Sequence, residues 1–147
     1  MRYAVSLPLS LIVTLAIASG AQERKDIHPF DGTWDTILSC TNNSGAYGYS
    51  DRFRSEIKEG MLHGEHGTKG QPGWLEINGK IKLDGDMELY ANGLVGAAAY
   101  AVGRIPAGTE YGYHIEGRFI DDEGKGKRVE GRPCEVTFAR VRTKDKD

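Results

Sequence analysis

Hydrophobic and polar residues alternate along most of the chain, as they do in β-strands that bury one face. In one clear stretch, Leu75, Ile77 and Ile81 share a face, while Glu76 and Lys80 lie on the other. Glycine-rich turns separate such stretches, and no helical period is sustained beyond the amino-terminal apolar segment. This pattern is typical of an all-β protein. We expect about eight strands, over residues 33–40, 49–58, 61–66, 73–82, 87–92, 111–120, 125–132 and 134–141.

The connections between these strands are short. Glu59-Gly60 and the stretches 83–86 and 121–124 are hairpin turn signals, because glycine and aspartate adopt the backbone angles of tight turns. Short links favour a meander, in which each strand pairs with the next. A meander of about eight strands removes its exposed edges by closing into a barrel, whose interior holds side chains or one small ligand.

Two cysteines indicate how the barrel closes. Trp34 lies six residues before Cys40, and Arg140 lies six residues after Cys134. If the first and last strands pair antiparallel with the cysteines opposite each other, Trp34 faces Arg140. Alternation puts all four side chains on the inner face. We therefore predict a single closed or nearly closed antiparallel up-and-down barrel, with its first and last strands paired and linked by a disulfide.

The amino terminus has the features of a secretory signal peptide: a short basic lead, an apolar centre and small residues before a cleavage point. We expect a signal peptide over residues 1–21, a flexible lead-in over 22–30, the barrel over 31–141 and a charged tail over 142–147. A lone cysteine pair in an exported chain is typical of a disulfide in an oxidising compartment. We expect the protein to be periplasmic or secreted.

The charge balance narrows the set of partners. The chain carries 19 Lys and Arg against 21 Asp and Glu, a net charge of −2. This balance argues against nucleic acid as a partner. We expect no membrane insertion once the signal is removed, and the sequence does not predict an oligomeric state.

Gly32-Thr33-Trp34 at the start of the first strand, with Arg140 on the last strand, resembles the signature of the calycin superfamily, which includes lipocalins, avidins and fatty-acid-binding proteins. The resemblance implies a meander barrel with a ligand in its mouth and a structural Trp34–Arg140 contact closing the other end. The later lipocalin sequence blocks and the biotin-contacting residues of avidins are not found. The layout also resembles small exported proteobacterial proteins of uncharacterised function that share the Asp-Gly-Thr-Trp opening and the Arg-Pro-Cys close.

Candidate catalytic and metal-binding residues are weakly patterned. His63 and His66 flank Glu65, but an odd spacing on a strand points the two histidines to opposite faces. The Gly-x-Ser-x-Gly elbow of serine hydrolases is absent from the sequence. We therefore expect no metal, no cofactor and no enzymatic activity.

Residues 93–109 form the longest interval without clear alternation, and they are small and apolar. Long apolar loops in small domains tend to be lids or binding loops. As a lid, the segment would carry its larger apolar residues to the barrel mouth, with Arg104 available for a polar or anionic head group: Leu94, Val95, Tyr100, Val102 and Ile105. The alternative is a further strand or a short helix that plugs the barrel.

The function we expect is that of an exported, non-enzymatic binding module for a small, partly apolar ligand at the barrel mouth. One alternative is a protein-interaction module, such as an inhibitor of an exported hydrolase. Another is a filled structural barrel without a ligand. A pocket of roughly 300 Å³ or more is typical of a binding module and would be missing from a filled barrel.

Overall fold

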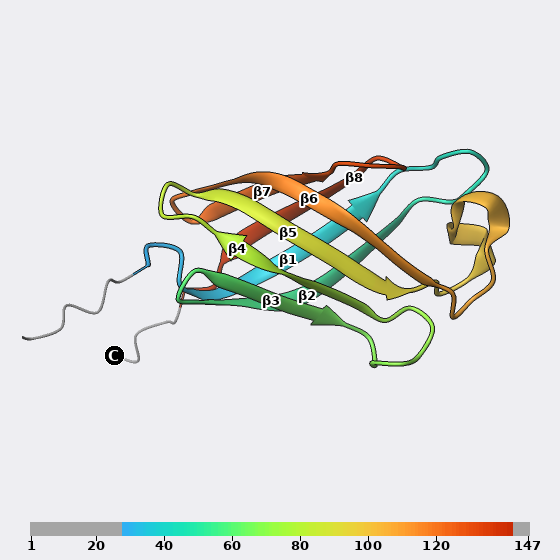
Figure 1. Ribbon diagram of the computed structural model, residues 1–147, viewed down its shortest axis with the longest axis horizontal. Coiled ribbons are helices and arrows are strands. Elements are labelled where there is room, and N and C mark those ends of the chain that lie inside the picture. Colours follow the sequence, from blue (N-terminus) through green and yellow to red (C-terminus); the bar gives the residue numbers. More distant parts are fainter. Residues whose placement is uncertain (1–27, 143–147) are drawn as a thin grey trace, which may run out of the picture.

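Eight antiparallel strands follow one another around a closed barrel in the computed structural model, which describes residues 28–142 (Figure 1). The predicted signal peptide therefore lies outside the described residues, as do most of the lead-in and of the tail. Two 3-10 turns, η1 (Ala98–Tyr100) and η2 (Val102–Arg104), lie between the fifth and sixth strands. The strands are β1 (Gly32–Cys40), β2 (Tyr49–Lys58), β3 (Met61–His66), β4 (Leu75–Ile81), β5 (Asp86–Leu94), β6 (Glu110–Ile120), β7 (Glu123–Arg128) and β8 (Cys134–Arg140).

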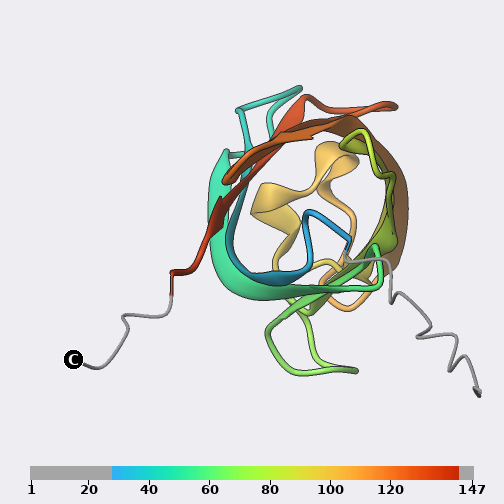
Figure 2. The ribbon, with the colours of Figure 1, turned by 90° about the vertical axis from the view of Figure 1, so that its left-hand side faces the viewer.

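The barrel closes through β1 and β8, which pair in the predicted register. Cys40 lies opposite Cys134 and Trp34 lies opposite Arg140, with no bulge between the two pairs. The cysteines form a disulfide across the strands. The predicted fold class is thereby confirmed. Figure 2 looks along the barrel and shows the strands as a complete ring.

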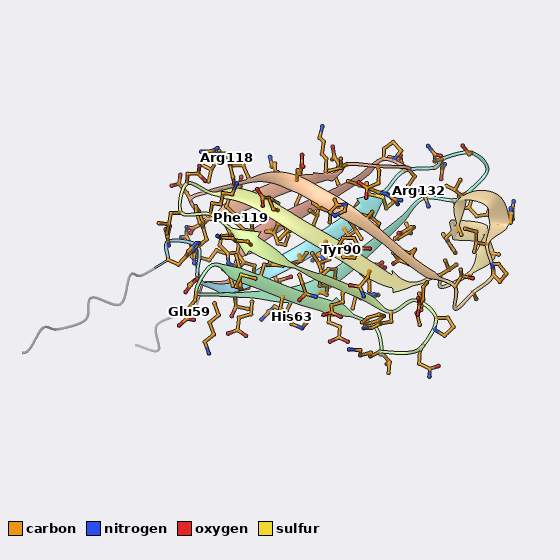
Figure 3. All side chains as sticks on the ribbon, in the orientation of Figure 1. Glu59, His63, Tyr90, Arg118, Phe119 and Arg132 are labelled. Atoms are coloured by element: carbon orange, nitrogen blue, oxygen red, sulfur yellow. A yellow bond between two sulfur atoms is a disulfide. The ribbon has the colours of Figure 1, made fainter. Side chains whose placement is uncertain are left out.

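Side chains fill the end of the barrel at which β1 begins. Trp34 is fully buried, and the guanidinium carbon of Arg140 lies 4.5 Å from the centre of its ring. Phe119, labelled at this end in Figure 3, packs edge-on against the indole at 4.8 Å. Arg140 also donates hydrogen bonds to the Asp122 carboxylate and to the carbonyl oxygens of Pro29 and Asp31. A planar guanidinium can stack and donate in its own plane at the same time, and in this way it closes the base.

The residues before Trp34 join this base to the β2–β3 hairpin. The Asp31 carboxylate accepts hydrogen bonds from the backbone N–H groups of Glu59 and Gly60, at 2.8 and 3.0 Å. Gly32 adopts φ 138°, and a Cβ there would lie 3.1 Å from Nη1 of Arg140. Glycine is favoured at this position because other residues rarely adopt that angle.

The last residues of the predicted lead-in are packed rather than loose. Phe30 is buried against Phe119, at 5.6 Å between ring centres, and its carbonyl accepts the indole N–H of Trp34. His28 forms a 2.7 Å hydrogen bond with the carbonyl of Ile81. These residues pack against the barrel because burying the Phe30 ring at the base removes its apolar surface from water.

Inward residues of neighbouring strands form the core. In β2, Phe53, Ser55 and Ile57 are buried, as the alternation predicts. β7 instead turns Gly124 and Gly126 inward, and the larger side chains of β5, β6 and β8 occupy the space beside them. The sequence pattern placed this strand at 125–132, because its Gly-Lys repeat gives no apolar row from which to read its limits. β4 is likewise shorter than predicted and β5 longer. Among the described residues, no helix is long and apolar enough to cross a membrane.

Replacing Cys40 and Cys134 together by alanine is expected to lower the free energy of unfolding by about 2–4 kcal/mol, because the bond closes a long loop in the unfolded chain. Urea denaturation measures the effect. Reduced wild-type protein is the control and should match the double variant. Equal stability of the oxidised wild type and the variant would contradict the expected contribution.

Arg140→Ala is expected to cost about 1–3 kcal/mol, because it removes the stack on Trp34 and leaves the partly buried carbonyl of Asp31 without its donor. The matched control is Arg118→Ala, which also breaks an arginine–aspartate pair, between Arg118 and Asp86, but on the exposed surface. It should change stability little. Equal effects of the two substitutions in urea denaturation would show that Arg140 contributes no more than a surface ion pair.

Candidate functional site

The end of the barrel opposite Trp34 is hollow. A cavity of about 810 Å³ opens there, beyond the packed core. Its walls come from residues at the mouth ends of β2, β3, β5, β6 and β7, and its cover is the segment between β5 and β6. In Figure 1 this segment is the gold loop at the right-hand end. The cavity and the Trp34–Arg140 contact therefore lie at opposite ends of the barrel.

The covering segment, residues 95–109, is hereafter called the lid. It contains the two 3-10 turns rather than a further strand, and the first two residues of the predicted interval complete β5. Backbone hydrogen bonds close its base, from Val95 N–H to the Thr109 carbonyl and from Gly108 N–H to the Val95 carbonyl. It also touches the β1–β2 loop, where Tyr47 N–H donates to the Ala99 carbonyl. The lid is thus fixed both to its own strands and to the far side of the mouth.

Five of the six residues that we predicted for ligand contact line the cavity: Leu94, Val95, Tyr100, Val102 and Ile105. Arg104, the sixth, is exposed and is not among the lining residues. Gly103 and Arg104 both have left-handed backbone angles, with φ of 79° and 55°. This local turn sets the direction of the Arg104 side chain, and the sequence pattern does not reveal it.

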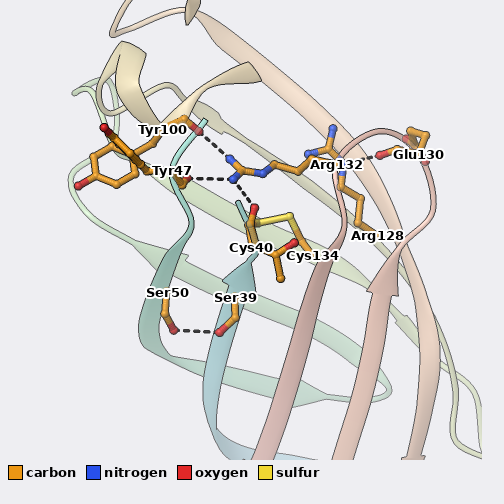
Figure 4. The surroundings of a disulfide bond; sticks show 10 residues. Ser39, Cys40, Tyr47, Ser50, Tyr100, Arg128, Glu130, Arg132 and Cys134 are labelled. Atoms are coloured by element: carbon orange, nitrogen blue, oxygen red, sulfur yellow. Dashed lines mark hydrogen bonds between the residues drawn. A yellow bond between two sulfur atoms is a disulfide. The ribbon is translucent and has the colours of Figure 1, made fainter. Parts of the chain in front are cut away.

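Arg132 holds the lid to the barrel. Its guanidinium donates hydrogen bonds to the carbonyls of Tyr100, Thr41 and Tyr47, at 2.6, 2.6 and 2.9 Å, and Figure 4 shows these bonds beside the disulfide. The residue is 7% exposed, and its guanidinium also lies over the ring of Tyr49. Sequence reasoning missed this role, although Arg132 stands two residues before Cys134 in the Arg-Pro-Cys close.

Polar side chains from opposite walls also face the cavity. Asp51 and His66 line it from β2 and β3, with Oδ1 and Nδ1 4.0 Å apart, and Tyr113 lines it from β6. The Tyr113 hydroxyl is buried and has no hydrogen-bond partner among residues 28–142. Buried polar groups are nearly always paired. The Tyr113 hydroxyl is therefore an exception to this rule at the wall of the cavity.

Burial shapes the ionisation of these groups. It raises the pKa of Asp51 above its usual value, and the nearby His66 opposes that shift. Burial is also the main cause that raises the pKa of Tyr113 and of Tyr111, with the neighbouring Tyr49 adding to both. The phenols therefore stay protonated at neutral pH and serve as hydrogen-bonding groups.

The two histidines that the sequence offered as metal ligands separate as their spacing predicts. His66 faces the cavity, whereas His63 is exposed and forms a 2.7 Å hydrogen bond with Asn78 on the outside of the sheet. Within the described part of the chain, no group of three or more His, Cys, Asp or Glu is placed to hold a metal ion. The nearest acidic group to His66 is instead Asp51, at 4.0 Å. Asp51 lies two residues before Phe53, so the alternation along β2 could have identified it as inward.

Comparison with known proteins found no matching family model, no matching curated protein and no matching solved structure. The likeness to exported proteobacterial proteins gains no support from these searches. The eight-stranded barrel itself is consistent with the calycin resemblance. The function is therefore inferred from the cavity.

Arg132→Ala is expected to loosen the lid, because one guanidinium ties it to the β1–β2 loop. Amide hydrogen exchange at Tyr47 and Gly108, whose N–H groups both donate to lid carbonyls, should speed up at least tenfold, on the order of 1.4 kcal/mol of lost protection. Amides of β3 should keep their rates. Arg54→Ala, on the exposed face of β2, is the control, and unchanged exchange in Arg132→Ala would rule out the tether.

Proposed function

We propose that this protein is an exported, non-enzymatic binding module that holds a small, partly apolar molecule in the barrel mouth. The observation that carries the proposal is the cavity of about 810 Å³ under the lid, well above the roughly 300 Å³ of a small-molecule site. A filled structural barrel would leave no such space. The calycin-like arrangement, with a closed base opposite the mouth, supports the same function.

The lining suits binding better than catalysis. Apolar lid residues and tyrosine rings supply most of the surface, and a few polar groups converge from the walls. This combination is usual in ligand pockets. Asp51 and His66 could orient a nucleophile, but neither serine nor cysteine occurs among the described residues that line the cavity.

The disulfide indicates a compartment outside the reducing cytoplasm. Together with the signal-like amino terminus, it supports a periplasmic or secreted location. In that setting a binding module would collect or carry molecules outside the cytoplasm.

A second candidate function is recognition of another protein at the mouth. Tyr47 and Tyr100 are 59% and 47% exposed and lie 6.2 Å apart, and Val102 and Ile105 are also exposed. Exposed aromatic and aliphatic residues that cluster on one rim are typical of interaction sites. Such a partner, for example an exported hydrolase, would cover the mouth.

Native mass spectrometry of the exported protein, purified from its own host, tests these functions. A retained molecule of small mass is expected, and a stoichiometric protein would favour the second candidate. A neutral apolar fluorophore such as Nile red tests the cavity directly, because its emission rises when it leaves water. Ala101→Trp places a large side chain on a lining residue and should weaken Nile red binding at least tenfold.

The matched control is Ala107→Trp, which adds the same ring to an exposed lid residue outside the lining and should bind the dye normally. Equal binding by the two variants would place the dye outside the cavity. Absence of both dye binding and a retained molecule would overturn the proposed function.

A further inference from the structure

The cavity walls carry both positively and negatively charged side chains. These side chains differ in how many hydrogen-bond and stacking partners they have within the protein. The Arg132 guanidinium donates hydrogen bonds to three backbone carbonyls and lies over the ring of Tyr49. Arg128 donates to the carbonyl of Glu130, and its guanidinium lies 4.1 Å from the centre of the Tyr113 ring. Each cation thus has at least one carbonyl acceptor and one aromatic ring as partners among the described residues.

Asp51 has no comparable partner. Among residues 28–142, its only ionic neighbour within 4.0 Å is Nδ1 of His66, at that limit. This separation exceeds the range of a hydrogen bond. The same Nδ1 is buried without a hydrogen-bond partner in the described part of the chain. Among the charged groups that line the cavity, the Asp51 carboxylate is thus the one with neither a hydrogen bond nor a stacked ring within the described residues, and burial makes an unpaired carboxylate costly.

Asp51 and Tyr113 come from opposite walls of the cavity. In the ring of eight strands, β2 and β6 are diametrically opposed, with three strands between them on either side. Asp51 belongs to the first and Tyr113 to the second, and both line the cavity. The space under the lid is therefore bordered by the Asp51 carboxylate on one side and by Tyr113 on the other.

We infer that the ligand is a small organic amine with an apolar body, whose protonated nitrogen pairs with the Asp51 carboxylate while the body lies under the lid. The inference rests on the proposed function. An ammonium forms charge-assisted hydrogen bonds, which are about twice as strong as neutral ones. A hydroxyl would gain only a single charge-assisted bond at Asp51, and a carboxylate would be repelled there.

A matched series of ligands tests the charge preference. 2-Phenylethylamine, 2-phenylethanol and 3-phenylpropanoate share one apolar body and differ in the end group. Isothermal titration calorimetry of the exported protein at pH 7 should give at least tenfold tighter binding for the amine than for the alcohol, with the carboxylate weakest. Binding of the alcohol or of the carboxylate as tight as that of the amine would overturn the inference.

Variants locate the preference at one residue. Asp51→Asn keeps the shape and removes the charge, so it should weaken amine binding at least tenfold and alcohol binding less than threefold. Asp51→Glu keeps the charge and should retain the preference for the amine. The control Asp35→Asn removes an equal charge from the exposed surface and should leave the series unchanged. A preference that persists in Asp51→Asn would also overturn the inference.

Nile red binding distinguishes a missing preference for the amine from a missing binding function, and it reports whether each variant is folded. If the wild type binds Nile red but shows no preference for the amine, the inference fails and the proposed function stands. If the wild type binds neither the dye nor any member of the series, both fail.

Discussion

The pairing of β1 with β8 is the constraint on which the rest of the structure depends. Because side chains alternate between faces, the register of this one pair decides which residues of both strands point inward. Cys40 and Cys134 hold the register at the mouth, and Trp34 and Arg140 hold it at the base. A slip of one residue would turn Trp34 to the solvent and separate the cysteines.

The two ends of the closed sheet are built differently. At the base, aromatic rings and the Arg140 guanidinium fill the interior, and backbone carbonyls satisfy its hydrogen bonds. At the mouth, the inward positions carry tyrosines, Asp51 and His66, which leave a space between the walls. Arg132 repeats at the mouth what Arg140 does at the base, since each guanidinium bonds several carbonyls and stacks on an aromatic ring. At the mouth, however, the bonds hold a cover above a space rather than a plug within it.

Much of this architecture could be predicted from the sequence, because alternation and turn residues are local signals. The spacing of Trp34 from Cys40 and of Arg140 from Cys134 identified the closing register, and Glu59-Gly60 forms the predicted hairpin turn, with φ of 52° and 75°. The limits of β7 were predicted less accurately, because glycines occupy its inner face and leave no row of apolar side chains in the sequence.

The site was only partly predictable. The apolar lid residues stand out as a continuous stretch, whereas Arg132 bonds to carbonyls far away in the sequence, and no local pattern encodes such a contact. Asp51 could have been found from the alternation along β2, because it lies two residues before the inward Phe53 and therefore points to the same face. An acid on an inner face runs against the expectation that such faces are apolar, and exceptions of this kind concentrate at functional sites.

An even number of strands in a meander returns the chain to the end from which it started. β1 begins and β8 finishes beside the Trp34–Arg140 contact, so the described chain enters and leaves at the base (Figure 1). A tether attached through either terminus would therefore orient the barrel with its opening directed away from the point of attachment. Immobilisation on a sensor surface or fusion to a second protein would leave the lid unobstructed.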